Sequence, residues 1–102
     1  MRPYETMLLV DPRREDAEIE ATLTAFAGLV TDRGGEVANW DRWGRRKLAY
    51  DMDDLTEGYY AVCTYNLDSS ARAELEAALP FVEGLVRSKT VRRDVRTRGV
   101  KS

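Results

Sequence analysis

Three consecutive cations follow a tryptophan-rich stretch near the middle of the chain and limit how that stretch can pack. Residues 39–50 read Asn-Trp-Asp-Arg-Trp-Gly-Arg-Arg-Lys-Leu-Ala-Tyr, with Arg45, Arg46 and Lys47 side by side. Neighbouring residues of a strand point to opposite faces, so three successive charged side chains cannot all be hidden. At least one side of this strand must therefore present positive charge. Such a strand is either a solvated edge that resists aggregation or a surface that meets phosphate.

Four short apolar stretches have the length and composition of strands. They cover residues 4–10, 36–52, 59–67 and 85–93. We expect Gly44 to mark a bulge in the second stretch, and residues 51–58 to form a hairpin loop before the third. Alternate residues of a strand share a face, so Cys63 lies on one side of the third stretch and Tyr60 and Val62 lie on the other.

Two segments between these strands show helical spacing instead. Over residues 14–33 apolar side chains recur every three or four positions, and a glycine pair at 34–35 ends the segment. The stripe consists of Ile19, Leu23, Phe26 and Val30, with Ala27 beside it. A second, shorter helix begins after Asp68 and is stopped by Pro80, with Leu75 on its apolar stripe. Such stripes are typical of helices that pack on a core rather than in a partner's groove.

The order of these elements is strand, helix, strand, strand, helix, strand. It predicts a split βαβ arrangement, in which both helices cover one face of a four-stranded antiparallel sheet. The opposite face is then open, and its side chains must be tolerable to water or matched to a partner.

Length and composition restrict the classes of function. The 102 residues, 43% of them hydrophobic, suffice for one domain with one modest core. The chain has no histidine and the single cysteine Cys63, which excludes a Ser-His-Asp or Cys-His nucleophile, a Cys/His zinc site and an internal disulfide. No apolar run is long enough for a bilayer and no signal-peptide core stands at the start, so we expect a cytoplasmic protein.

Charge is distributed unevenly along the chain. Residues 1–84 contain 9 Lys and Arg against 17 Asp and Glu, a net −8, whereas residues 85–102 contain 7 against 1, a net +6. We expect a folded domain over residues 1–94 and a basic, flexible tail over residues 95–102. Because the cations at this end have almost no compensating acid, phosphate binding explains them better than solubility does.

Three further features could carry chemistry, and each has a simpler explanation. Four carboxylates could hold a divalent cation, but their spacing matches no calcium loop, and acids are common in solvated turns. They are Asp51, Asp53, Asp54 and Glu57. Cys63 is expected to be a buried, inert thiol. Tyr60 could stack on a base, although one tyrosine among aliphatic side chains is a weak platform. We expect no catalytic residue, no metal and no cofactor.

Four segments, taken together, carry a likeness to a known family. The most specific is Trp-Gly-Arg-Arg-Lys-Leu-Ala-Tyr at residues 43–50. Weaker matches in the right order are Met-Arg-Pro-Tyr-Glu at 1–5, Gly-Tyr-Tyr at 58–60 and Val-Arg-Ser-Lys-Thr-Val-Arg at 86–92. These segments resemble bacterial small-subunit ribosomal protein six over residues 2–94. Two departures are Asp-Met at 51–52, where members often have Pro-Ile, and Lys47, where arginine is common.

The resemblance implies an α+β, ferredoxin-like domain of βαββαβ order without catalytic activity. It also implies a structural component of the ribosome that binds the central domain of small-subunit ribosomal RNA together with small-subunit protein eighteen. The expected RNA-binding residues are Arg2, Arg45, Arg46, Lys47, Arg87, Arg92 and Arg93. The expected partner-binding residues are Leu48, Tyr50 and Val62.

Two other functions stay open from the residues themselves. A ferredoxin-like regulator that dimerises through its sheet would need a pocket with convergent polar groups for a small ligand. A free-standing binder of single-stranded RNA would need more aromatic side chains on the open face. The basic end of the chain and the absence of histidine argue against the regulator.

Overall fold

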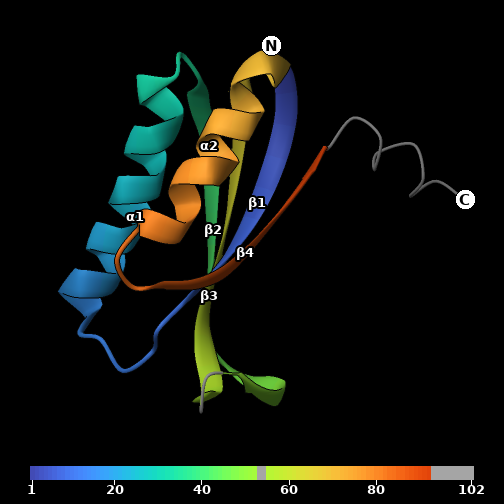
Figure 1. Ribbon diagram of the computed structural model, residues 1–102. Helices are drawn as coiled ribbons and strands as arrows, with labels where there is room; N and C mark the ends of the chain where they lie inside the picture. Colours follow the sequence, from blue (N-terminus) through green and yellow to red (C-terminus); the bar gives the residue numbers. More distant parts are fainter. Residues whose placement is uncertain (53–54, 93–102) are drawn as a thin grey trace, which may run out of the picture.

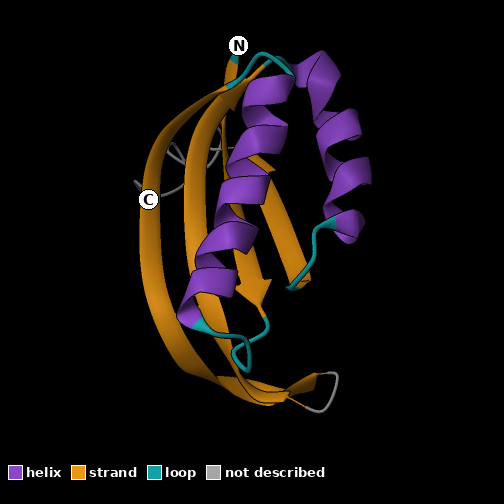
Figure 2. Cartoon of the chain, turned by 90° about the vertical axis from the view of Figure 1, so that its left-hand side faces the viewer, coloured by secondary structure: helices purple, strands orange, loops and turns teal. Residues whose placement is uncertain are grey.

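The chain forms two layers, with two helices packed on one face of a four-stranded sheet (Figures 1 and 2). The computed structural model describes residues 1–52 and 55–92, with the side chains of residues 48–52 and 55–56 left out. The strands are β1 (Arg2–Val10), β2 (Glu36–Met52), β3 (Leu55–Leu67) and β4 (Leu85–Arg92). The helices are α1 (Asp16–Asp32) and α2 (Arg72–Ala78), and 3-10 turns η1 (Ser69–Ala71) and η2 (Leu79–Phe81) flank α2. The predicted fold class is confirmed.

The first and last strands lie side by side in the sheet, whose order is β2-β3-β1-β4. β1 runs antiparallel to both of its neighbours, and Tyr4 stands opposite Tyr65 of β3 and Arg92 of β4. The outer strands β2 and β4 therefore form the two edges. This order brings the cations of the fourth strand next to the start of the chain.

The core lies between the sheet and the helices. Phe26 of α1 and Leu75 of α2 are both fully buried, which confirms that these helices face the sheet. The Phe26 ring meets Tyr65 and Trp40 edge-on, with ring centroids 5.7 and 6.2 Å apart, and such pairs add to the energy of area burial. The hydroxyl group of Tyr65 is also buried here, and it is satisfied by a hydrogen bond with Thr6 Oγ1, 2.8 Å away.

The end of α1 depends on a glycine that no other residue replaces cheaply. Gly34 has φ +83°, the left-handed region in which a Cβ is strained. Its amide donates to the carbonyl of Thr31, 3.0 Å away, and so closes the last turn of the helix. The predicted stop at the glycine pair is confirmed.

The start of β3 differs from the sequence prediction. β3 begins at Leu55 rather than at residue 59, because the ladder with β2 continues past Gly58 through the pairs Lys47 with Glu57 and Met52 with Leu55. The predicted hairpin loop over 51–58 is therefore too long. Polar residues indicate a turn when they are read locally, but backbone pairing can extend a strand through them.

The last strand ends at Arg92, and the predicted tail and Arg93 lie outside the described residues. The proposed boundary at residue 94 stays a prediction. None of the helices in the part of the chain that the structure describes combines the length and hydropathy needed to cross a membrane.

Candidate protein and nucleic-acid interface

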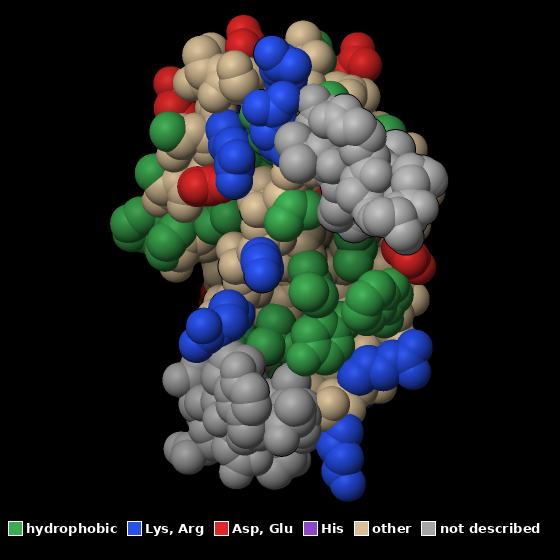
Figure 3. Space-filling view, turned by 90° about the vertical axis from the view of Figure 1, so that its right-hand side faces the viewer, with side chains coloured by type: hydrophobic (Ala, Val, Ile, Leu, Met, Phe, Trp, Pro, Cys, Tyr) green, Lys and Arg blue, Asp and Glu red, His purple; other side chains and the backbone are tan. Residues whose placement is uncertain are grey.

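The face of the sheet that the helices leave uncovered carries an apolar patch. Its side chains come from all four strands, because alternate residues of each strand point to this side. We define the open-face patch as Met7, Leu9, Trp43, Tyr60, Val62 and Val91. Figure 3 shows hydrophobic side chains gathered over this face with Lys and Arg around them. A contiguous apolar surface bordered by charge is typical of an interface.

Trp43 lies on the open side of β2, at a bulge in the strand. The register with β3 shifts between Arg42 and Gly44, and Gly44 has φ +82°. The predicted bulge is thereby confirmed. The Trp43 ring lies 6.2 Å from that of Tyr60, between centroids, and its Nε1 donates to Asp41 Oδ2 at 3.1 Å. With 44% of its surface exposed, Trp43 is a large, oriented side chain on an otherwise open face.

Sequence reasoning did not include Trp43 among the site residues. The signal that could have found it is strand alternation, since Trp43 lies three residues after Trp40, which stands opposite the buried Cys63 on the helix side. The bulge acts on the residues that follow, because it places Arg45 opposite Tyr59 and Arg46 opposite Gly58.

The three consecutive cations divide between the two faces. Arg46 stands opposite Gly58 and is exposed on the open face, whereas Arg45 and Lys47 point to the helix side of β2. Arg45 is held there, because its guanidinium donates to the carbonyl oxygens of Pro12 and Arg14 and to Asp16 Oδ1, at 3.3, 3.4 and 3.3 Å. Of these three expected RNA-binding residues, Arg46 alone shares a face with the open-face patch.

The fourth strand supplies further cations on the open face. Arg87 stands opposite Leu9 and Lys89 opposite Met7, and both side chains are exposed. Arg92 belongs to the other set of alternate residues, since it stands opposite the buried Tyr4. Arg2, at the start of β1, belongs to that set too. The expected RNA-binding residues among those described therefore form separate groups rather than one cluster.

A cation that sequence reasoning missed lies near Arg92. Arg72 of α2 stacks over the Tyr4 ring, with its Cζ 5.2 Å from the centroid. Its Nε lies 2.8 Å from a carboxylate oxygen of Glu76, one turn further along the helix. The sequence signal was weak, because an arginine at the start of a short amphipathic helix is usually a solvated charge.

The expected partner-binding residues are placed only in part. Leu48 and Tyr50 belong to β2 by their backbone, but their side chains lie outside the described ones. Val62 points to the open face, where it stands opposite Met7, and 8% of its surface is exposed. It forms the floor of the patch rather than a protruding contact.

Two shallow hollows indent the open-face patch. The smaller, of about 200 Å³, is lined by Met7, Leu9, Tyr60, Arg87, Ser88 and Lys89. The larger, of about 350 Å³, is lined by Glu5, Met7, Trp43, Val62, Lys89 and Val91. Met7 and Lys89 line both, so they separate one hollow from the other.

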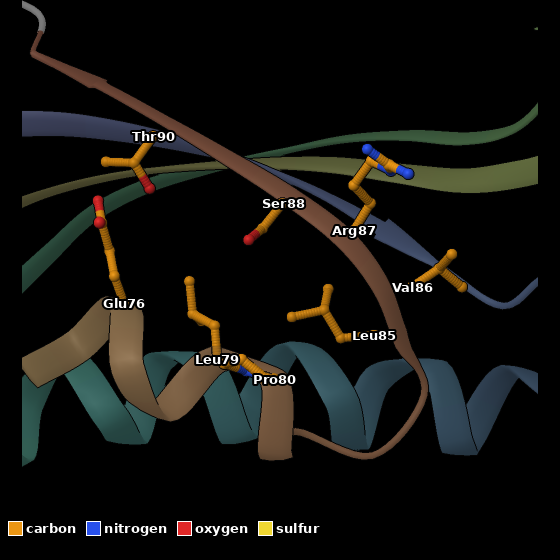
Figure 4. A pocket seen from close by; sticks show the side chains of 8 residues that line it. All are labelled: Glu76, Leu79, Pro80, Leu85, Val86, Arg87, Ser88 and Thr90. Carbon is orange, nitrogen blue, oxygen red and sulfur yellow. The ribbon is translucent and has the colours of Figure 1, made fainter. Parts of the chain in front are cut away.

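A third groove, of about 390 Å³, lies between α2 and β4 on the helix side of the sheet (Figure 4). Glu76 and Leu79 reach from the helical side toward Ser88 and Thr90 of the strand. Two of its polar groups already have partners, since Glu76 pairs with Arg72 and Thr90 Oγ1 lies 2.8 Å from Thr6 Oγ1. These pairs argue against the convergent free polar groups that a small-ligand regulator needs.

The remaining candidate chemistry lies in the core. Cys63 is fully buried on the helix side, as predicted, and burial raises the pKa of its thiol to about 12. The reactive thiolate is therefore suppressed at neutral pH. No group of three or more His, Cys, Asp or Glu side chains is arranged to hold a metal within residues 1–47 and 57–92, but the side chains of Asp51, Asp53 and Asp54 lie outside that part.

Comparison with known proteins identifies this architecture. The family model "Ribosomal protein S6" matches residues 3–92. The chain is 39% identical over 94 residues to the small ribosomal subunit protein bS6 of Thermoanaerobacter pseudethanolicus, covering 92% of this chain and 99% of that protein. It is 40% identical over 96 residues to the bS6 of Salinispora arenicola, covering 94% and 100%.

A solved structure agrees with these sequence matches. The crystal structure of 30S ribosomal protein S6 from Thermotoga maritima superposes with a TM-score of 0.86 at 27% identity, covering 98% of this chain and 95% of that one. The shared fold includes the sheet with two helices on one face. The chain therefore belongs to the ribosomal protein S6 family, the bS6 proteins of the small ribosomal subunit.

Proposed function

We propose that this chain binds the central domain of small-subunit ribosomal RNA jointly with small-subunit protein eighteen, as the family resemblance implies. The observation that carries the proposal is the open-face patch, which is apolar in its centre and has Arg46 and Arg87 at its border. Apolar surface gains from being covered by another protein, and border cations can meet the phosphates of RNA beside it.

The protein partner would cover the patch itself. Trp43 and Tyr60 supply a pair of aromatic side chains, the kind of anchor that dominates many interfaces. The Asp41 carboxylate orients the indole before binding, which reduces the ordering cost of association. We extend the proposed set of Leu48, Tyr50 and Val62 by these two aromatic residues.

The RNA would contact cations at both ends of the sheet. Arg87 and Arg92 are five residues apart on β4, a separation of roughly 16 Å at about 3.3 Å per residue. One set of phosphates would therefore be reached by Arg92, Arg2 and Arg93. A different set would be reached by Arg46, Lys47 and Arg87. Since A-form RNA hides its base edges in a deep groove, we expect contacts to phosphate and 2′-hydroxyl groups.

Sedimentation tests the proposal. A lysate of the source cells is fractionated on a sucrose gradient at low and high salt, and the chain is located with an antibody. We expect it to sediment with small ribosomal subunits at low salt and to be partly released at high salt, because phosphate contacts weaken as counterions compete. Recovery of the whole pool at the top of the gradient under both conditions would overturn the proposal.

One observation favours a second function, a free-standing binder of single-stranded RNA. The Trp43 and Tyr60 pair gives the open face the second aromatic side chain that such a binder needs. An unstructured oligonucleotide, titrated without protein eighteen, separates the two functions. Tight binding that is lost in Trp43→Ala would support this alternative over the joint assembly.

A further inference from the structure

Lys89 lies on the edge strand β4, against the open-face patch and between Arg87 and Val91 on the same side of the strand. It stands opposite Met7 on the neighbouring strand and lines both hollows. It is exposed, and no ion pair joins it to any acid within residues 1–47 and 57–92. Glu5 lines the larger hollow but not the smaller one.

Covering this patch would remove water from around the Lys89 ammonium group. An ammonium that loses its hydration without gaining a partner costs several kcal/mol, which would offset much of the gain from apolar contact. The two arginines differ from Lys89 in position. Arg87 lines the smaller of the two hollows but not the larger, and Arg46 lines neither, so both guanidinium groups can stay hydrated at the rim. The occupant of the patch must therefore supply the partner that Lys89 lacks within residues 1–47 and 57–92.

We propose that Lys89 selects the protein that covers the open face, and that this protein presents an Asp or Glu carboxylate to Lys89 between two apolar side chains. One apolar side chain would enter the hollow beside Leu9 and Tyr60, and the other the hollow beside Trp43 and Val62. The smaller hollow, at about 200 Å³, is below the range of about 300–1,000 Å³ typical of small-molecule sites and suits a single side chain.

The inference rests on the proposed function, because it takes the occupant of the open face to be a protein. It goes further by naming the chemistry that this protein must carry and the residue that recognises it. A carboxylate opposite Lys89 would fix the register of the partner on a face that is otherwise largely apolar, since like charges or an unpaired lysine would penalise other registers.

A double-mutant cycle tests this inference. Small-subunit protein eighteen is the probe, and its dissociation from the immobilised chain is timed in the presence of excess central-domain RNA fragment. Lys89→Met keeps the apolar stem and removes the charge. We expect dissociation at least about tenfold faster, with the loss confined to Lys89→Met and not seen in Arg42→Met, a control cation on the helix side that is bound to Glu20.

The acids of protein eighteen are then changed one at a time to Asn or Gln. In one of these variants, Lys89→Met should cause no further loss, which identifies the coupled carboxylate. Equal dissociation from wild type and Lys89→Met would overturn the inference, because the lysine would then reach solvent. If Lys89→Met speeds dissociation in every acid variant of protein eighteen, the inference is also overturned, and Lys89 would then contact an RNA phosphate instead of a carboxylate.

Failure of the proposed function looks different. If the wild-type chain does not bind protein eighteen with or without the RNA, both the joint assembly and the role of Lys89 fall together. If the wild type binds and the cycle shows no coupling, the assembly stands and only the carboxylate is rejected. Thermal melting of each variant confirms that Lys89→Met, an exposed substitution, leaves the fold intact.

Discussion

Arg45 shows how the surroundings of a single side chain decide its role. From the sequence it is one of three equivalent cations, but its guanidinium is bonded to two carbonyl oxygens and to Asp16 at the start of α1. The ion pair is exposed, and such pairs contribute about 0–1 kcal/mol. Arg45 therefore joins β2 to α1, and it would have to exchange these contacts before it could meet a phosphate.

Phe26 makes the most direct residue-scale prediction about stability. Its ring is fully buried and meets both Tyr65 and Trp40, so Phe26→Ala leaves a cavity among aromatic neighbours. We expect a loss of about 3–5 kcal/mol in the free energy of unfolding, measured with urea. A loss below about 1 kcal/mol would show that the ring contributes far less than its burial indicates.

Cys63 predicts a pH effect at the same scale. Burial raises the pKa of its thiol to about 12, whereas an unfolded thiol titrates near about 8.5. The folded state thus keeps the proton more tightly, so the stabilisation is complete below about pH 8.5 and is lost as pH rises toward 12. Relative to Cys63→Ala, wild-type stability should fall between pH 8 and 10. In native protein at pH 8 a thiol reagent should react slowly, and rapid labelling would contradict the buried position.

At the scale of elements, the spacing of apolar residues predicted the helices and the faces that they bury. The stripe of α1 follows directly from helical spacing, and all four of its predicted residues are buried. The extension of β3 to Leu55 could not be predicted, because backbone pairing with β2 and not side-chain pattern makes it. The separation of Arg45 from Arg46 was implicit in strand alternation and the bulge at Gly44 was predicted, but which of the two arginines faces the open side needed the register itself.

The hairpin of β2 and β3 carries the element-scale prediction. We expect Leu48 to belong to the surface that a protein partner covers, because it lies two residues after Arg46 on β2 and alternate residues of a strand share a face. Leu48→Asp should then abolish binding of protein eighteen, since a buried unpaired carboxylate costs several kcal/mol, while the melting temperature changes little. Calorimetry of the complex, with Thr31→Asp on the exposed end of α1 as control, checks it. Unchanged affinity would remove Leu48 from the interface.

The whole molecule separates a helical layer from a basic, apolar sheet face. On the helical side, Glu20, Glu74 and Glu83 each pair with an arginine of the chain itself. Membership of a family of structural ribosomal proteins confirms the expectation that the chain is no enzyme, and it places the chain on the ribosome in the cytoplasm, as predicted. The acids of the helical side are thus paired within the chain, whereas the open face of the sheet carries the surface that we propose meets the assembly.

Salt dependence tests that division at the same scale. Alanine at both Arg92 and Arg93 should flatten the slope of log affinity against log salt by roughly 1–2 units if each side chain neutralises one phosphate. The measurement uses the RNA fragment with protein eighteen present, because acids elsewhere in the domain repel RNA. Arg42→Ala, which removes a cation already bound to Glu20, is the control. A slope equal to that of the wild type would mean that the two arginines are solvated charges.

The three-residue spacing of Trp40 and Trp43 along β2 also gives the protein two separate optical reporters, because it places the two indoles on opposite faces of the sheet. Trp40 packs against Phe26 on the covered side of β2, whereas Trp43 lies beside Tyr60 on the open side. Indole fluorescence depends on local polarity, so Trp40 emission should follow unfolding and Trp43 emission should follow occupation of the sheet. Trp43→Phe would leave a pure folding signal, and Trp40→Phe a docking signal. One chain without any added dye can thus report its own stability and its own assembly independently.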